Sequence, residues 1–103
     1  MNFNPFEMAK QMGNLEAQMK KMKEEISKLS VTGESGAGMV EITMNGDFQV
    51  SSLSINEAML GKENKGTLEV LLVSAFNDAS NKAKAAAEEL AKKQAGLMGI
   101  LGK

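Results

Sequence analysis

Apolar residues recur at alternating spacings of three and four through the first 30 residues of the chain. This spacing places them on one narrow stripe of an α-helix, at the a and d positions of three heptads. Such a stripe is narrower than the face that a helix usually turns toward its own globular core. The pattern predicts a coiled-coil helix that pairs with a second copy of the chain, with packing on the chain's own sheet as the alternative. The seam, as this stripe is called below, consists of Met8, Met12, Leu15, Met19, Met22, Ile26 and Leu29.

The pattern changes to short alternating runs in the middle of the chain. Val31–Glu34 and Met39–Met44 are candidate strands, joined by the glycine-rich residues 35–38. A third alternating run occupies residues 48–55. These runs predict three short antiparallel strands joined by tight turns.

A hairpin is predicted between the second and third runs. Asn45-Gly46 is a strong hairpin signal. The register follows the face that is buried, so we expect a three-residue loop with Gly46 at positive φ, which puts Ile42 beside Phe48. The alternation of apolar residues slips at Ser51-Ser52, which predicts a β-bulge there.

A second long helix is predicted from near Thr67 to Gly96, because apolar residues again keep to one helical face. Residues 1–95 then form one domain, and residues 96–103 a flexible apolar tail. The predicted fold class is α+β, with two long helices flanking a three-stranded antiparallel sheet. The apolar face of the second helix comprises Leu68, Leu71, Leu72, Ala75, Phe76, Ala79, Ala83, Ala86, Ala87 and Leu90.

The composition argues against an enzyme. The chain has no His, Cys, Tyr or Trp, and every basic residue is Lys. Without His and Cys, most zinc and copper sites and most nucleophile–base pairs cannot be built. We therefore expect no catalytic residue, no metal site, no cofactor and no small-molecule substrate. A carboxylate-dependent enzyme acting through Glu41 or Asp78 is the remaining catalytic alternative.

Two local features need separate interpretation. Residues 33–38 are rich in glycine but lack the Gly-Lys-Ser/Thr ending of a phosphate-binding P-loop, and a strand follows them. They predict a hairpin connection instead. Asn77 and Asp78 are poor helix formers inside a predicted helix. They mark either a functional position or an ordinary surface pair between Asp78 and Lys82.

Charge is unevenly distributed along the chain. Residues 1–30 carry a net charge of +1, residues 31–81 carry −5 and residues 82–103 carry +3. Any polyanion should therefore meet the helices and avoid the sheet. The chain shows neither a signal peptide nor an apolar run of about 20 residues, so we expect a cytoplasmic protein without membrane contact.

Three segments together resemble the YbaB/EbfC family of bacterial nucleoid-associated proteins. They are V-T-G-E-S-G-A-G from Val31, the Asn45-Gly46 turn, and A-F-N-D-A from Ala75. The methionine- and lysine-rich first helix is also similar to that of the family, so the resemblance covers residues 5 to 95. It implies an α-β-β-β-α fold, a tweezer-like homodimer with protruding helices, nucleoid association and an influence on gene expression.

The resemblance further implies that double-stranded DNA binds to the two helices. Arg is absent, so the bidentate contact with guanine cannot be made. Lys acts chiefly as a point charge for phosphates, and weak, salt-sensitive binding with little sequence specificity is expected. The alternative is an interaction scaffold that docks onto DNA-handling proteins. The candidate DNA-binding residues are Lys10, Lys20, Lys21, Lys28, Lys82, Lys84, Lys92 and Lys93.

Overall fold

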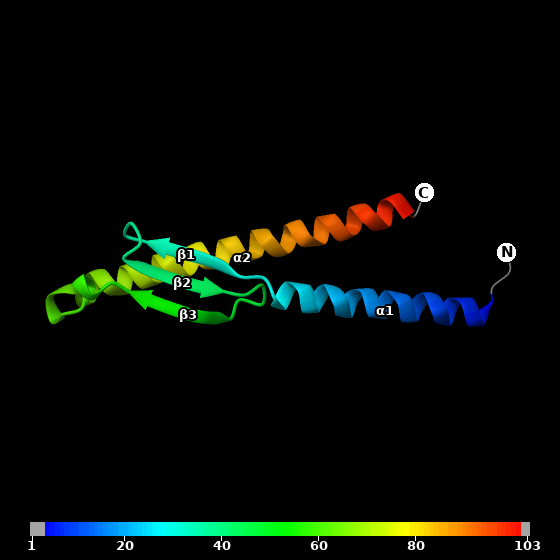
Figure 1. The fold of residues 1–103 in the computed structure, drawn as a ribbon, viewed down its shortest axis with the longest axis horizontal. Coiled ribbons are helices and arrows are strands. Elements are labelled where there is room, and N and C mark those ends of the chain that lie inside the picture. The colour runs from blue at the N-terminus through cyan, green and yellow to red at the C-terminus, as the bar shows by residue number, and fades with distance from the viewer. Residues whose placement is uncertain (1–3, 102–103) are drawn as a thin grey trace.

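The structure is a computed structural model that describes residues 4–101, with the side chains of residues 4–94. It has the predicted order of a helix, a three-stranded antiparallel sheet and a second long helix (Figure 1). The elements are α1 (Pro5–Ser27), β1 (Val31–Ser35), β2 (Val40–Met44), β3 (Val50–Ile55), the short 3-10 turns η1 (Glu57–Met59) and η2 (Lys62–Asn64), and α2 (Lys65–Leu101). The prediction of an α+β chain is confirmed.

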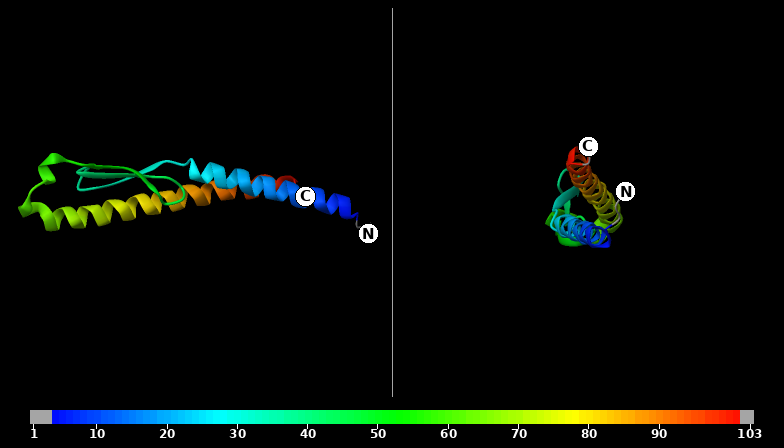
Figure 2. Two further views of the ribbon diagram at one scale, coloured as in Figure 1. Left: turned by 90° about the horizontal axis from the view of Figure 1, so that it is seen from below. Right: turned by 90° about the vertical axis from the view of Figure 1, so that its right-hand side faces the viewer.

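The sheet forms one layer and α2 forms a second layer on it, and α1 extends beyond them. The strand order is β1-β2-β3, and α2 covers one face of the sheet along β1 and β2 (Figure 2). The principal extents are 73 × 21 × 15 Å, and the radius of gyration is 20.6 Å. A compact domain of this length would have a radius of gyration of about 13 Å. The single chain therefore leaves much of its surface without an internal partner.

The core lies between β2 and the middle of α2. Val40, Ile42 and Met44 point inward from β2, and Ala75, Ala79 and Ala83 pack against them from α2. Burying a large aliphatic side chain contributes about 1.5–3 kcal/mol, and an alanine methyl contributes only about 0.8 kcal/mol. With alanines forming the helix side, the core is small for a chain of this length.

β1 approaches α2 unusually closely at Gly33. A Cβ at Gly33 would collide with the backbone of Ala75 and Ala79. Two residues further along β1, the Ser35 hydroxyl donates a 2.6 Å hydrogen bond to the Leu71 carbonyl oxygen of α2. The glycine at position 33 therefore allows a strand and a helix to pack backbone against backbone.

The hairpin between β2 and β3 differs from the predicted register. Ile42 pairs with Leu53, not with Phe48, so that prediction is wrong. Met44 pairs with Val50 and Thr43 pairs with Ser52, which leaves one extra residue on β3. This confirms the predicted bulge at Ser51-Ser52.

The turn of this hairpin is shaped by Asn45. Its side-chain oxygen accepts hydrogen bonds from the backbone N–H groups of Asp47 and Gln49, at 2.9 and 3.0 Å. Positive φ occurs at Phe48 (64°) and not at Gly46, so the predicted role of that glycine is wrong. Gly46 instead donates its N–H to the Ile26 carbonyl oxygen at 3.1 Å, where a Cβ would collide with that carbonyl. Because Gly46 has no side chain, the end of α1 can pack against the hairpin at this position.

The start of α1 and the end of α2 have different causes and outcomes. α1 begins at Pro5, which has the fixed φ suited to the first helical position, and the Asn4 side chain accepts the Phe6 N–H at 3.0 Å. α2 continues through Gly96 to Leu101, so the prediction that Gly96 ends the helix is wrong. The boundary between a domain and a tail at residue 95 remains a prediction.

Candidate nucleic-acid interface

Two helical arms extend from the same end of the sheet. They are α1 and the C-terminal part of α2, which run in the same direction away from the sheet (Figure 1). The Gln94 amide donates a 3.4 Å hydrogen bond to the Glu25 carboxylate and connects the two arms near the sheet. With 23 residues, α1 is about 34 Å long. No helix within residues 4–101 is long and apolar enough to cross a membrane.

All four predicted DNA-binding lysines of the first arm are exposed, three within α1 and Lys28 at its C-cap. Lys10, Lys21 and Lys28 are separated by 11 and 7 residues, which are close to whole numbers of helical turns. They therefore form one line on the side of α1 opposite the seam, and Lys20 lies on its flank. Lys23 is also exposed, nearer the seam, and was not among the predicted residues.

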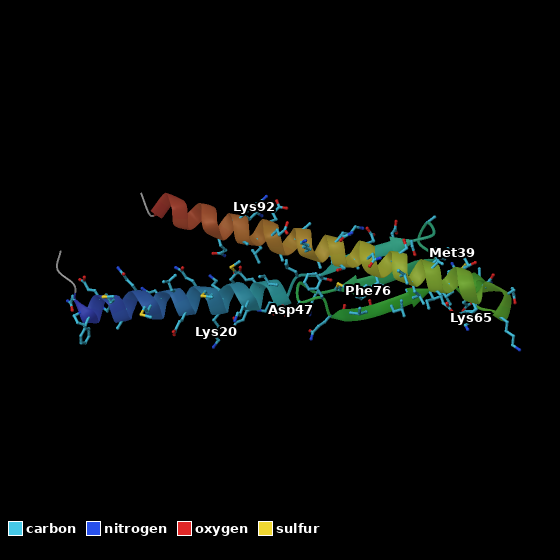
Figure 3. All side chains as sticks on the ribbon, turned by 180° about the vertical axis from the view of Figure 1, so that it is seen from behind. Lys20, Met39, Asp47, Lys65, Phe76 and Lys92 are labelled. Atoms are coloured by element: carbon cyan, nitrogen blue, oxygen red, sulfur yellow. The ribbon has the colours of Figure 1, made fainter. Side chains whose placement is uncertain are left out.

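Three of the four predicted lysines on α2 are available to a ligand. Lys84, Lys92 and Lys93 are exposed and take no part in the two ion pairs within the described side chains, Lys65–Glu69 and Lys82–Asp78. In Figure 3, Lys20 and Lys92 lie on the outer sides of the two arms and point away from each other. These two lysines thus lie on opposite sides of the molecule.

The fourth lysine, Lys82, is held by the fold. Its ammonium group lies 3.1 Å from Oδ2 of Asp78 and donates a 3.1 Å hydrogen bond to the Thr32 carbonyl oxygen. Oδ2 of Asp78 also accepts the backbone N–H of Glu34 at 3.0 Å. Together, Asp78 and Lys82 cover outward-facing backbone groups on the free edge of β1, which would otherwise be open to pairing with another strand. A phosphate at Lys82 would compete with these contacts.

The same contacts shift the ionisation of Asp78. The hydrogen bond from the Glu34 backbone holds the pKa of the Asp78 carboxyl below its ordinary value of 3.8, and the hydrogen bond from Lys82 acts in the same direction. Both favour the charged carboxylate. Asp78 is therefore a structural anion within the helix, which explains why a poor helix former stands there.

Among the described residues, no group of three or more His, Cys, Asp or Glu side chains comes together that could hold a metal ion. The glycine-rich residues form the predicted hairpin turn, with positive φ at Gly36, Ala37 and Gly38. The Met39 N–H donates to the Gly36 carbonyl oxygen at 3.2 Å across this turn.

The seam is largely free in the single chain. Met8, Met12, Leu15 and Met19 are exposed, and only the residues near the sheet, from Met22 onward, include half-buried members. The alternative that the whole seam packs on the chain's own sheet is therefore wrong. Its pairing with a second copy remains a prediction.

An apolar groove that was not predicted runs between α2 and β3. It has a volume of about 360 Å³. α2 covers β1 and β2 but does not reach across β3, so Phe76, which was expected on the buried face, remains 43% exposed. Val70, Val73 and Phe76 recur at every third residue, and this second apolar stripe was the available signal. The groove is lined by Ile42, Val50, Leu53, Leu72, Val73, Phe76 and Asn77.

Comparison with known proteins agrees with this architecture. A nucleoid-associated protein from Rhodopseudomonas palustris (strain BisB5) is 40% identical over 95 residues, which cover 92% of this chain and 87% of that protein. The crystal structure of an uncharacterized protein from Helicobacter pylori has the same fold, with a TM-score of 0.75 at 22% identity, covering 90% of this chain and 98% of that one. Residues 1–98 match the family's common pattern, and the chain belongs to the YbaB/EbfC DNA-binding family.

Proposed function

We propose that this protein binds double-stranded DNA as a homodimer, through contacts between the lysines of its helical arms and DNA phosphates. Binding has little sequence specificity and serves nucleoid organisation and, through it, gene expression. Lys82 contributes least to binding, because the fold already uses its charge. The DNA-binding residues are the arm lysines Lys10, Lys20, Lys21, Lys28, Lys82, Lys84, Lys92 and Lys93. The protein acts in the cytoplasm, on the nucleoid.

The separation of charge along the molecule is the observation that carries this proposal. The arms hold the basic segments of the chain, and residues 31–81, which build the sheet and the start of α2, carry a net charge of −5. A polyanion is attracted to the arms and repelled from the sheet. Membership of a DNA-binding family and the nucleoid-associated relative support DNA as that polyanion.

The chemistry of lysine determines the kind of binding. An ammonium group on a flexible stem neutralises a phosphate without recognising a base edge. Each neutralised phosphate releases condensed counterions, so affinity falls steeply with salt. α1 is about as long as one turn of B-DNA, so a line of lysines along it can follow the backbone over that distance. Two copies double the number of arms and raise the avidity without any new contact.

Fluorescence anisotropy of a labelled duplex, titrated with protein at several salt concentrations, tests this function. Backbone binding predicts a log–log slope of about −0.9 per contacted phosphate, so four to six contacts correspond to slopes of roughly −3 to −6. The slope should be the same for two duplexes of unrelated sequence. Absence of binding even at low salt would overturn the proposal.

A second candidate function has one observation in its favour. The seam exposes Met8, Met12 and Met19, and methionine-rich surfaces adapt to varied partners. An interaction scaffold that docks onto DNA-handling proteins would use this surface. Such a scaffold shows no salt-dependent shift of a bare duplex, and the anisotropy titration therefore separates the two functions.

A further inference from the structure

We propose that Phe6, at the far end of the α1 arm, is an apolar wedge that inserts between two base pairs from the minor groove of double-stranded DNA and kinks the duplex. This inference rests on the proposed function, because the lysines of the arm must first hold the duplex. It adds a second mode of contact to the lysine–phosphate contacts, so that the protein bends the DNA that it binds.

Phe6 stands at the tip of the arm and is open to solvent. It is the second residue of α1, and α1 begins at the end of the arm that is farthest from the sheet (Figure 1). The Phe6 side chain is 79% exposed, more than any other large apolar side chain in the described part of the chain. A side chain this exposed can enter another molecule without any rearrangement of the fold.

Phe6 belongs to the lysine side of α1 and not to the seam. Successive residues of an α-helix are turned by about 100°, so Phe6 lies about 40° around the helix from Lys10 and about 160° from Met8, the first seam residue. Lys21 and Lys28 continue the line of Lys10 along the arm. A helix that docked on the seam would therefore leave Phe6 uncovered. The ligand that meets the lysines is the one that also meets Phe6.

The tip combines one aromatic ring with one positive charge. Pro5, Phe6, Ala9 and Lys10 line a hollow at the start of α1. Lys10 follows Phe6 by about one turn, or about 6 Å along the helix axis, and can contact a phosphate beside the step that Phe6 enters. The acidic residue of the first turn, Glu7, is turned about 60° from Lys10 on the side away from Phe6. Its carboxylate therefore does not stand between the ring and the lysine.

The dimensions of DNA direct this tip to the minor groove. An α-helix with its side chains is about 10–12 Å wide, and the minor groove of B-DNA is about 6 Å wide, so only the end of α1 can reach into it. In the major groove a phenyl ring would meet mainly polar base edges, with the thymine methyl group as the exception. Proteins that bind the minor groove insert Phe, Leu, Ile, Met or Pro between base steps and kink the duplex by about 20–90°. Phe6 offers the same chemistry.

A lipid surface suits the tip less well than DNA. A helix that lies in a membrane interface buries a broad apolar face along its length. The face of α1 that carries Phe6 continues instead with Lys10, Lys21 and Lys28. Insertion between base pairs needs only one ring at the end of a basic arm.

The test uses the full-length protein and a duplex with a central TA step, which kinks easily. The adenine of that step is replaced by 2-aminopurine, whose fluorescence rises when it loses its stacking, and the duplex ends carry a donor and an acceptor dye. The wild type should raise the 2-aminopurine fluorescence several-fold and increase the energy transfer between the dyes. Phe6→Ala should lose both changes and keep the salt slope of the wild type, because no lysine is removed.

The variants are chosen so that the fold is kept. Phe6 is exposed, and alanine is the strongest helix former. Phe6→Leu should retain both changes, since leucine also serves as a wedge. The matched control is Leu60→Ala, which removes a side chain that is 58% exposed at the opposite end of the molecule and should behave as the wild type.

The outcomes separate this inference from the proposed function. A wild type that binds the duplex without either change, or a Phe6→Ala variant that keeps both, would overturn the wedge and leave the lysine–phosphate contacts standing. A wild type that binds no duplex at low salt would overturn the proposed function and the wedge with it. If Phe6→Ala keeps both DNA signals but loses binding to vesicles of anionic phospholipid, the tip serves a lipid surface and the wedge is overturned.

Discussion

The backbone N–H of Glu34 donates a 3.0 Å hydrogen bond to Asp78, a residue 44 positions away in the chain. The preceding residue, Gly33, lies against the backbone of Ala75 and Ala79. The V-T-G-E-S segment on β1 and the A-F-N-D-A segment on α2 are therefore the two sides of one packing contact. The residues that most clearly mark the family hold the fold together, and the DNA-binding candidates lie on the arms.

Replacing Asp78 with Asn should make the stability of the folded protein less sensitive to acidic pH. The folded-state pKa of Asp78 lies below its ordinary value of 3.8, so ionised Asp78 stabilises the folded protein. This stabilisation is complete above that ordinary value and is lost as pH falls through the folded-state pKa. The thermal midpoint of Asp78→Asn should lie below that of the wild type at pH 7, and the difference should shrink as the pH falls below 3.8. Glu69→Gln, which removes the exposed 3.8 Å pair with Lys65, is the matched control and should change little. A constant difference from pH 7 to pH 2 would contradict this account of Asp78.

Gly33→Ala should be strongly destabilising. The added methyl group has no space between β1 and α2, and overpacking of this kind costs about 1–3 kcal/mol or more. Gly13→Ala is the matched control, because nothing lies within 4 Å of a Cβ there, and it should stabilise α1 by about 0.5–1 kcal/mol. Urea denaturation of both variants measures the two effects. A Gly33→Ala variant as stable as the wild type would show that the close contact does not exist.

Gly46→Ala should loosen the joint between α1 and the sheet. The new Cβ would collide with the Ile26 carbonyl oxygen and break the hydrogen bond from the Gly46 N–H. We expect a loss of about 1–3 kcal/mol, together with faster hydrogen exchange near the end of α1. Unchanged exchange there would mean that α1 is positioned by other contacts.

The order of the elements could be predicted from the sequence because it depends on local periodicity. The seam, the alternating strands and the bulge at Ser51-Ser52 follow directly from which positions are apolar. The register of Ile42 could not, because Phe48 adopts the positive φ and Gly46 is needed for contact with Ile26. That contact joins parts of the chain that local patterns do not connect.

The candidate site was predictable only as far as charge and exposure allow. The exposed lysines of the arms are polar positions on amphipathic helices, and the sequence identifies these well. The role of Lys82 was hidden, since its partner Thr32 lies on a strand 50 residues away. The groove at Phe76 was signalled only by the stripe of Val70, Val73 and Phe76, because helical spacing does not reveal how far across the sheet α2 reaches.

The most direct test of the central claim compares two double variants in the salt-dependent anisotropy titration. Lys20→Gln with Lys21→Gln removes two lysines from α1, and Lys62→Gln with Lys65→Gln removes two from the opposite end of the molecule, so the change in net charge is the same. Loss of the arm lysines should weaken binding and reduce the salt slope by about 1 for each lysine in contact, whereas the control pair should leave the slope of the wild type. Equal slopes for the two variants would show that the arms do not hold the DNA backbone.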